Sequence, residues 1–487
     1  MAAASPFPAA GADAAVLGVD LEPIKAAAQQ LRSQVEAGRM PGFLACTLQG
    51  EPGKTGKLLH WESHGWGDVA TRMPLRSDTL FRLYSQTKPV TVVGFMRLVE
   101  KGLISLEDPL VRYIPAFAKL TVGSRNRPLK REVRVHDLLA HTSGIGFGPG
   151  FGNDPENNYE KDYWDLVKQV DSGRVQSLKD WCDELAKVPL RFQPGVDWGY
   201  GYSSDVLGRV VEVVSGRPLD EFLTKEILQP LGMRDTFFAV PSNKKQRLAA
   251  LYNREPWDGS GPAKKVKFIV VDPSGLPQAE EGGSAPSSSV FLAGSASKVI
   301  QGGGCVCSVA GGLVSTMQDY AKFGQMMVNE GEFNGTRLLE PASVRLLARD
   351  WLNDYTLDKR RKPLWVWGTP GVGFSPLGQI GVAHPQAVGR RSPGAALNTV
   401  HWGGAGGSGY MFNWPHRLLV LTYTGCTYDT ATQKLMWRAA FAALRSGGAK
   451  ALSPPESEGG VSKKRKSQGP SETPAKKRLR RKRPRSR

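Results

Sequence analysis

The sequence predicts an α/β fold in which an antiparallel sheet, built from both ends of the chain and flanked by helices, carries an all-α lobe. Two observations lead to this expectation. β-Like runs separated by turn residues lie near the N-terminus and again over residues 409–425, around a Trp414–Pro415 turn. Apolar residues recur at helical spacing through most of residues 80–231. Strands at both ends with helices between them indicate one sheet assembled from the two termini.

The expected elements follow from local patterns along the chain. Residues 21–39 have apolar positions at helical spacing and a stop at Gly38, which predicts an amphipathic helix. The runs 43–48 and 57–61 flank a turn-forming stretch and predict a hairpin. Further helices are expected over 89–101, 134–140, 178–187, 205–215, 219–230, 316–329 and 341–349.

The composition is that of a globular protein with a basic end. Of the 487 residues, 40% are hydrophobic and 22% are charged, which excludes a collagen-like, coiled-coil or wholly disordered chain. The formal charge is +19, and residues 451–487 hold 13 basic and 3 acidic side chains, so they supply +10 of it. The rest of the chain is therefore only mildly basic.

The chain is expected in the cytoplasm, the nucleus or both, and not to be secreted. It has no apolar run long enough for a membrane-spanning helix, and its N-terminus lacks the charged start and apolar core of a secretory signal. Its five cysteines are few and scattered, which indicates a reducing compartment. No second cysteine pair accompanies Cys305 and Cys307, and no H-E-x-x-H motif occurs, so neither a metal site nor another cofactor is expected.

The pattern S-x-x-K occurs three times, and only one copy opens an apolar helix. The copies at Ser242 and Ser295 lie in polar or Gly/Ser-rich sequence. Ser85 and Lys88 instead precede a run that is apolar on nearly every face, which predicts a buried central helix. Pro89 lacks an N–H and is tolerated only in the first turn, so this helix should begin at about Ser85.

This placement gives Ser85 the surroundings of a nucleophile. It would lie at the positive end of the helix dipole, with Lys88 three residues later on the same face. A weak serine nucleophile needs a neighbouring base, and a buried lysine is costly without a role. The alternative from local reasoning is a structural lysine whose charge is satisfied elsewhere.

The chain resembles the serine β-lactamase-like superfamily, on motifs that cover roughly residues 22–445. This superfamily includes class C β-lactamases, D-alanyl-D-alanine carboxypeptidases, family VIII carboxylesterases and lovastatin-type transacylases. The resemblance implies a β-lactamase/transpeptidase-like fold and a catalytic role for Ser85 and Lys88. The motifs occur in the family's order: 80–89, 98–109, 137–144, 194–195, 231–236 and 310–316.

The family also has a catalytic tyrosine, for which Tyr200 and Tyr202 compete. Tyr202 begins the literal string Y-S-S, but esterase members resemble W-x-Y followed five residues later by Asp and then Leu-Gly. That spacing selects Tyr200, with Asp205 as the later acid, and makes Tyr202 a packing residue. Tyr202 then occupies the position where class C enzymes carry Asn, which weakens any expectation of β-lactam hydrolysis.

The family has a K-T-G motif in the later part of its sequence, and this chain contains a misleading copy of that motif, a decoy, near its N-terminus. Lys54-Thr55-Gly56 is a literal match, but it lies in the turn of the first hairpin, ahead of Ser85. The expected counterpart is the segment 401–404, whose sequence resembles esterase and transacylase variants; its residues His401, Trp402, Gly403 and Gly404 are the substrate-binding candidates. By resemblance, the backbone N–H groups of Ser85 and Gly404 form the oxyanion hole.

These residues predict a serine hydrolase that acts through an acyl-enzyme on neutral esters or amides, as carboxylesterases do. Ser85 would attack the carbonyl carbon while Lys88 and Tyr200 move its proton, and which of the two is the general base stays open. The alternatives are an acyltransferase with the same nucleophile and a catalytically silent scaffold of the same fold. His141 is expected only to end a helix, in a turn that Gly144 closes.

The predicted domain organisation places one catalytic domain between two flexible ends. Residues 1–20 form a flexible N-terminus, and the catalytic domain covers 21–445, with a Gly/Ser-rich insertion at about 254–304. Within that domain the sheet lobe is expected at about 21–80 and 305–445, and the helical lobe at about 100–240.

Residues 446–487 are predicted to be a disordered basic tail. Two basic clusters within residues 463–485 are typical of a bipartite nuclear import signal, which an import receptor binds, or of an electrostatic nucleic-acid contact. The third possibility is a tail that serves only solubility.

Overall fold

The central element is an eight-stranded antiparallel sheet that both halves of the chain build. The computed structural model describes residues 19–51, 53–147, 159–171, 174–254, 268–271, 312–354, 364–381, 399–427 and 429–446. The strands lie in the order β12-β13-β14-β15-β16-β1-β2-β3. In sequence order they are β1 (Gly42–Gln49), β2 (Lys57–Asp68), β3 (Met73–Pro74), β12 (Val372–Ser375), β13 (Gly378–Gly381), β14 (Thr399–Gly404), β15 (Ser408–Asn413) and β16 (Leu418–Tyr423).

The pairing of β1 with β16 joins the two halves of the sheet. Leu44 lies opposite Tyr423, and the antiparallel register continues to Gln49 opposite Leu418. Both strands are buried along almost their whole length because helices cover both faces of the sheet. The predicted sheet from both termini and its two hairpins are therefore confirmed.

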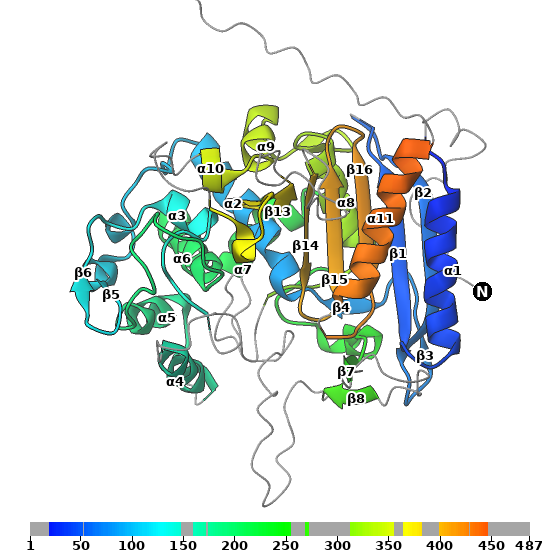
Figure 1. Cartoon of the computed structure of the whole chain (residues 1–487), viewed down its shortest axis with the longest axis horizontal. Coiled ribbons are helices and arrows are strands. Elements are labelled where there is room, and N and C mark those ends of the chain that lie inside the picture. The colour runs from blue at the N-terminus through cyan, green and yellow to red at the C-terminus, as the bar shows by residue number, and fades with distance from the viewer. Residues whose placement is uncertain are drawn as a thin grey trace, which may run out of the picture. The chain divides into compact units, whose positions relative to one another are not determined.

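Helices α1 (Glu22–Glu36) and α11 (Thr430–Ser446) lie together on one face of the sheet (Figure 1). Their apolar residues pack on alternate residues of the strands below, such as Phe43 and Ala45 of β1. The intervening residues Leu44 and Cys46 point to the other face and join the main core. This alternation follows from the two-residue period of a strand.

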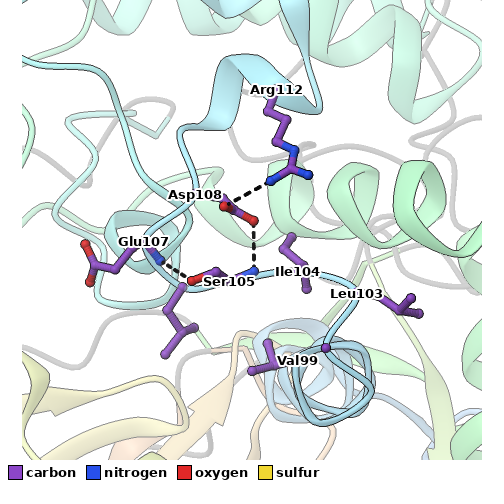
Figure 2. A pocket seen from close by; sticks show the side chains of 9 residues that line it. Val99, Leu103, Ile104, Ser105, Glu107, Asp108 and Arg112 are labelled. Atoms are coloured by element: carbon purple, nitrogen blue, oxygen red, sulfur yellow. Dashed lines mark hydrogen bonds and ion pairs between the residues drawn. The ribbon is translucent and has the colours of Figure 1, made fainter.

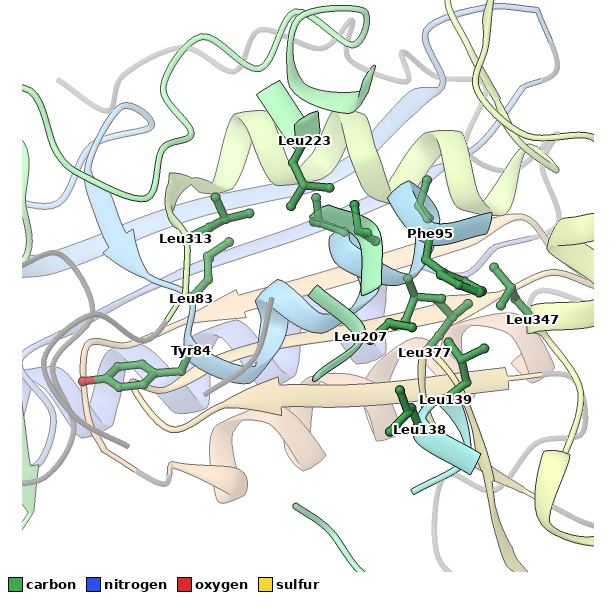
Figure 3. Packing of buried hydrophobic residues seen from close by; sticks show 14 of the residues in the cluster. Leu83, Tyr84, Phe95, Leu138, Leu139, Leu207, Leu223, Leu313, Leu347 and Leu377 are labelled. Atoms are coloured by element: carbon green, nitrogen blue, oxygen red, sulfur yellow. The ribbon is translucent and has the colours of Figure 1, made fainter. Parts of the chain in front are cut away.

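The other face of the sheet and the helical lobe share one large hydrophobic core around α2 (Lys88–Glu100). Figure 3 shows Phe95 of α2 near Leu207, with Leu83 and Tyr84 at the start of the segment that enters the helix. The remaining helices are α3 (Val135–Leu139), α4 (Tyr159–Asp171), α5 (Leu178–Leu185), α6 (Ser203–Ser215), α7 (Leu219–Leu223), α8 (Met317–Val328), α9 (Pro341–Leu347) and α10 (Trp351–Asp354).

Short two-stranded pairings lie outside the main sheet. They are β4 (Leu80–Arg82) with β9 (Val314–Thr316), β5 (Thr121–Val122) with β6 (Arg127–Pro128), β7 (Leu251–Arg254) with β8 (Phe268–Val271), and β10 (Glu332–Phe333) with β11 (Thr336–Arg337). Within the described ranges, no helix has the length and apolar character needed to cross a membrane.

The expected helices are present, with shifts at their ends. The helix expected over 219–230 is the short α7 followed by a π-helical turn, Thr224–Leu228. The sequence prediction missed α4, α10 and α11 and the strands β12–β14. The N-terminal residues 1–18, most of the 254–304 insertion, the Cys305–Cys307 pair and the basic tail lie outside the described residues.

Candidate active site

Ser85 lies in a constrained turn between β4 and α2. β4 pairs with β9, and Leu83 N–H donates to Leu313 O at 2.9 Å, which fixes the chain just before the serine. Tyr84 has φ = +47°, a left-handed conformation that is unfavourable for a bulky residue. A 3₁₀ turn over Tyr84–Thr87 then leads into α2, whose first turn contains Pro89. The helical segment thus begins at about Ser85, as its sequence predicts.

Three predicted residues meet at this turn. Ser85 Oγ lies 2.6 Å from Tyr200 Oη, and Lys88 Nζ donates a hydrogen bond to Ser85 Oγ at 3.2 Å. Lys88 Nζ also lies over the Tyr200 ring, 4.9 Å from its centroid. All three side chains are buried. A hydroxyl in contact with two groups that accept or donate protons is the arrangement that nucleophilic catalysis requires.

The segment before α6 places Tyr200 and separates it from Tyr202. Gly201 has no room for a Cβ, which would lie 2.0 Å from Ile145 O, so the chain passes directly over its neighbour. Tyr202 is fully buried, and its ring packs against Phe147, Trp181 and Tyr163, away from Ser85. The structure therefore brings only Tyr200 of the two candidates to the serine.

His141 ends α3 as expected, and its ring also contacts the site. It has φ = +55° and is 3% exposed. The imidazole stacks on the Tyr200 ring, with centroids 4.9 Å apart and planes at 27°. Burial lowers the pKa of His141 to about 3, and the positive charge of Lys88 contributes to this shift. The ring contact was not predictable from the turn motif alone.

Asp205, in the first turn of α6, has a buried carboxyl group whose pKa is also affected by the charge of Lys88. It is 1% exposed, and its Oδ1 has no hydrogen-bond partner among the described residues. Burial raises the pKa of Asp205 to about 7, although the positive charge of Lys88 opposes this shift. A carboxyl with a pKa this high is typical of functional sites.

The segment 401–404 divides between two faces of the sheet. Trp402 lies opposite Tyr410 on β15 and contacts the Tyr200 ring, with centroids 5.6 Å apart. His401 lies opposite Met411, and its ring contacts that of Trp437 of α11 in a tilted arrangement, with centroids 4.5 Å apart. Because neighbouring strand residues point to opposite faces, only Trp402 can face the serine. This corrects the expectation that His401 contacts the substrate.

Gly404 lies against the backbone just before Ser85, whereas Gly403 lies against Gln433 of α11. A Cβ on Gly404 would lie 2.0 Å from Leu83 O, so no larger residue fits there. Ser408, which lies directly opposite Gly404 across the β14–β15 turn, donates through Oγ to the same oxygen at 3.2 Å. The expected close approach of this segment to the nucleophile is therefore present.

Two further aromatic residues complete a wall that the sequence analysis missed. Phe374 of β12 lies 5.9 Å from Trp402 and 5.6 Å from Trp198, between ring centroids. Phe374 also meets the edge of His141 at 5.2 Å. Trp198 belongs to the motif that selected Tyr200, but nothing in the local sequence relates Phe374 to it.

Two other features lie away from Ser85. Lys54-Thr55-Gly56 occupies the β1–β2 turn, as the decoy interpretation requires. A hollow of about 480 Å³ lies beside the C-terminal end of α2, roughly 16 Å along the helix from Lys88 (Figure 2). Asp108 in this hollow accepts hydrogen bonds from Ser105 N and Arg112. Among the described residues, no group of His, Cys, Asp or Glu side chains could hold a metal ion.

Residues 28–445 match the family described as Beta-lactamase. The chain belongs to the beta-lactamase family. It is 31% identical over 389 residues to esterase EstB of Burkholderia gladioli, covering 77% of this chain and 84% of EstB. It is 30% identical over 404 residues to protein Rv1367c of Mycobacterium tuberculosis, covering 81% and 87% of the two chains.

Solved structures share the fold. The structure of "EstCE1, a hydrolase with promiscuous acyltransferase activity" superposes with a TM-score of 0.63 at 20% identity, covering 86% of this chain and 99% of EstCE1. Proteins similar to this chain thus include an esterase, and a protein of the same fold is described as a hydrolase with promiscuous acyltransferase activity. The resemblance inferred from the motifs, including its fold, is confirmed.

Proposed function

We propose that this protein is a serine acyl hydrolase that cleaves neutral esters through an acyl-enzyme on Ser85. The observation that carries the proposal is the contact of one buried hydroxyl, Ser85 Oγ, with both Tyr200 Oη at 2.6 Å and Lys88 Nζ at 3.2 Å. The likeness to esterase EstB supports an ester rather than another acyl compound.

In the proposed first half-reaction, Ser85 Oγ forms a bond to the carbonyl carbon of the ester. Its proton passes to the Tyr200–Lys88 pair, which returns a proton to the leaving alcohol as the C–O bond breaks. In one version a neutral Lys88 is the base. In the other, the Lys88 ammonium near the Tyr200 ring stabilises a phenolate that is the base. Water then attacks the acyl-enzyme by the reverse proton path and releases the carboxylic acid.

The negative oxygen of the tetrahedral intermediate needs hydrogen-bond donors. The backbone N–H groups of Ser85 and Gly404 are the proposed donors, because the end of β14 lies against the backbone just before the serine. Loss of one such donor typically lowers the rate by about a hundredfold to a thousandfold.

The wall beside Tyr200 favours an uncharged, apolar acyl group. Trp402, Phe374 and Trp198 present rings there, and His141 is uncharged because burial keeps its pKa near 3. Trp402 occupies the strand position that faces the site. The side chains described for this wall carry no positive charge, so none of them can pair with a carboxylate on a substrate. Neutral esters, and then amides, are therefore proposed ahead of β-lactams.

Acyl transfer is the second candidate function. The same acyl-enzyme can be attacked by an alcohol or an amine instead of water, and the promiscuous acyltransferase activity of EstCE1, which shares the fold, supports this option. An aromatic wall would retain an apolar acceptor near the ester carbon.

The test is covalent labelling with a fluorophosphonate, read by intact mass, for the wild type beside Ser85→Ala. One adduct on the wild type and none on Ser85→Ala is expected. Absence of labelling in folded wild-type protein would support the silent-scaffold alternative. Comparing p-nitrophenyl butyrate with a chromogenic cephalosporin tests the substrate class, and faster cephalosporin turnover would contradict it. Added alcohol that yields a new ester would indicate transfer.

The basic tail is proposed to bind a nuclear import receptor. Its clusters, Lys463–Lys466 and Lys476–Arg485, are separated by about ten residues, and it has no aromatic residue for stacking on bases. A fluorescent fusion should be nuclear, and its truncation after Ala449 should not be. Unchanged localisation would contradict the proposal, and salt-sensitive RNA binding by the intact protein alone would favour the electrostatic alternative.

A further inference from the structure

His141 occupies a backbone position that suits glycine, which calls for an explanation. It follows α3 at φ = +55°, where a left-handed residue commonly ends a helix. Three residues later, Gly144 takes the same conformation at φ = +84°. A buried histidine at such a position has both an unfavourable backbone and a desolvated ring. Residues with a strained backbone persist only where the surrounding structure holds them in place, and they are concentrated at active sites.

Both the backbone and the ring of His141 hold the segment that carries Tyr200. His141 O accepts a hydrogen bond from Gly199 N at 3.0 Å. The ring stacks on Tyr200 at 4.9 Å, and Phe374 meets it edge-on at 5.2 Å. The Tyr200 ring is therefore supported directly by His141, which Phe374 supports in turn.

We propose that His141 is a positioning residue whose ring supports the Tyr200 ring and thereby keeps Tyr200 Oη at Ser85 Oγ. This inference rests on the proposed function of Ser85, Lys88 and Tyr200. No hydrogen bond joins the His141 side chain to Ser85 among the described residues, and the inference is that His141 acts through Tyr200 and not on the substrate.

The electrostatics agree with a mechanical role. Burial and the charge of Lys88 lower the pKa of His141 to about 3, so the ring is uncharged at neutral pH. A protonated imidazole would place a second cation beside the Lys88 ammonium. His141 Nδ1 has no hydrogen-bond partner among the described residues, so stacking, and not hydrogen bonding through that atom, is the relevant contact.

Three variants separate the ring from the backbone. His141→Asn keeps a residue that tolerates the left-handed conformation but removes the ring. His141→Phe keeps a flat ring for stacking. His60→Asn makes the same change at a partly buried histidine of β2, whose side chain is 13% exposed and which lies four strands from β14 in the sheet, as a control for loss of an imidazole elsewhere.

For a neutral ester, His141→Asn should lower kcat about 10- to 100-fold with KM nearly unchanged, because misplacement of a catalytic group by about 1 Å costs this much. His141→Phe should recover most of kcat, and His60→Asn should keep the wild-type kcat. In a Tyr200→Phe background, His141→Asn should lower kcat no further. Equal losses for the Asn and Phe variants, or additive losses with Tyr200→Phe, would overturn the proposal.

A crystal structure of His141→Asn gives a readout that does not need turnover. Tyr200 Oη is expected to move out of hydrogen-bond distance from Ser85 Oγ, and an unchanged contact would overturn the inference. If His141→Asn does not fold, His141→Leu is used in its place. The proposal would be contradicted if Tyr200 occupied the same position in His141→Leu as in His141→Phe. Failure of the proposed function would instead be recognised by unlabelled Ser85 in the wild type.

Discussion

Asp137 in α3 and Asp205 in α6 are equally buried carboxyls with opposite surroundings. Asp137 is 0% exposed and accepts hydrogen bonds from Arg131 at 2.7 and 2.8 Å and from Arg134 N at 2.9 Å. Burial alone would raise its pKa, but hydrogen bonds from Arg131 and His136 lower it to about 2. Asp205 has no hydrogen-bond partner at Oδ1 among the described residues, and burial raises its pKa to about 7.

The difference shows that donors, and not depth, decide what a buried carboxyl does. Asp137 fixes the turn after its helix, and so contributes to stability. Asp205 costs stability when ionised, and the positive charge of Lys88, a proposed catalytic residue, acts on its pKa. Unfavourable groups of this kind are concentrated at functional sites, where they are retained for another reason.

The largest expected effect is the pH dependence that Asp205 imposes on stability. Its pKa is raised from 3.8 to about 7, so between these values the folded state holds a proton that the unfolded state has lost. The contribution of Asp205 to the free energy of unfolding is fully present below about pH 4. It falls by about 4 kcal/mol in total as the pH rises through 7. Asp205→Asn cannot ionise, so its free energy of unfolding relative to wild type should rise between pH 4 and 8, as measured by urea denaturation.

A constant difference between Asp205→Asn and the wild type across this range would contradict that prediction. It would mean that Asp205 does not change its protonation on folding. Asp183→Asn, which removes an exposed partner of Lys179, is a suitable control and should change stability little at any pH.

The second effect is the loss of the Arg131–Asp137 pair. Asp137→Asn should lower the free energy of unfolding by about 3 kcal/mol at pH 7, because it removes a carboxylate that several donors share. The pKa of Asp137 is lowered from 3.8 to about 2, so its contribution is present above pH 4 and is lost as pH falls through 2. Denaturation at pH 7 and pH 2 should therefore show the variant and the wild type converging in acid.

An equal loss at both pH values would mean that the variant acts through packing and not through charge. The contrast with Asp205→Asn is then the informative comparison. Two identical substitutions at equally buried positions should change stability in opposite directions at pH 8.

The sequence predicted these residues unequally, for physical reasons. The spacing within 80–89 and 198–208 is local, so it identified Ser85, Lys88, Tyr200 and the position of Asp205. The apolar helix after Ser85 and the two hairpins are likewise indicated by the local spacing of apolar residues. The fold was therefore predictable from the sequence. Helix α11 was missed, although its apolar face packs on β16 and α1.

What the sequence did not predict depends on contacts between distant segments. The stack of His141 on Tyr200 and the approach of Phe374 arise from packing of α3, the loop before α6 and β12. His401 was misassigned because a one-residue shift along a strand exchanges the two faces of the sheet. The motif gave the correct segment, and only the register of β14 with β15 distinguishes Trp402 from His401.

The smallest expected effect on stability comes from removing a single hydrogen-bond donor to Asp137. Thr142, which is fully buried, donates through Oγ1 to Asp137 Oδ1 at 3.1 Å. Thr142→Val keeps the shape and removes that bond, so the free energy of unfolding should fall by about 1 kcal/mol at pH 7. Because the ionised carboxylate loses a donor, the pKa of Asp137 should rise toward 3.8, and acid unfolding should begin at a higher pH than in the wild type. If stability falls while the acid transition stays where it is, the hydroxyl contributes packing alone, and the Arg131 guanidinium and His136 suffice to hold Asp137 ionised.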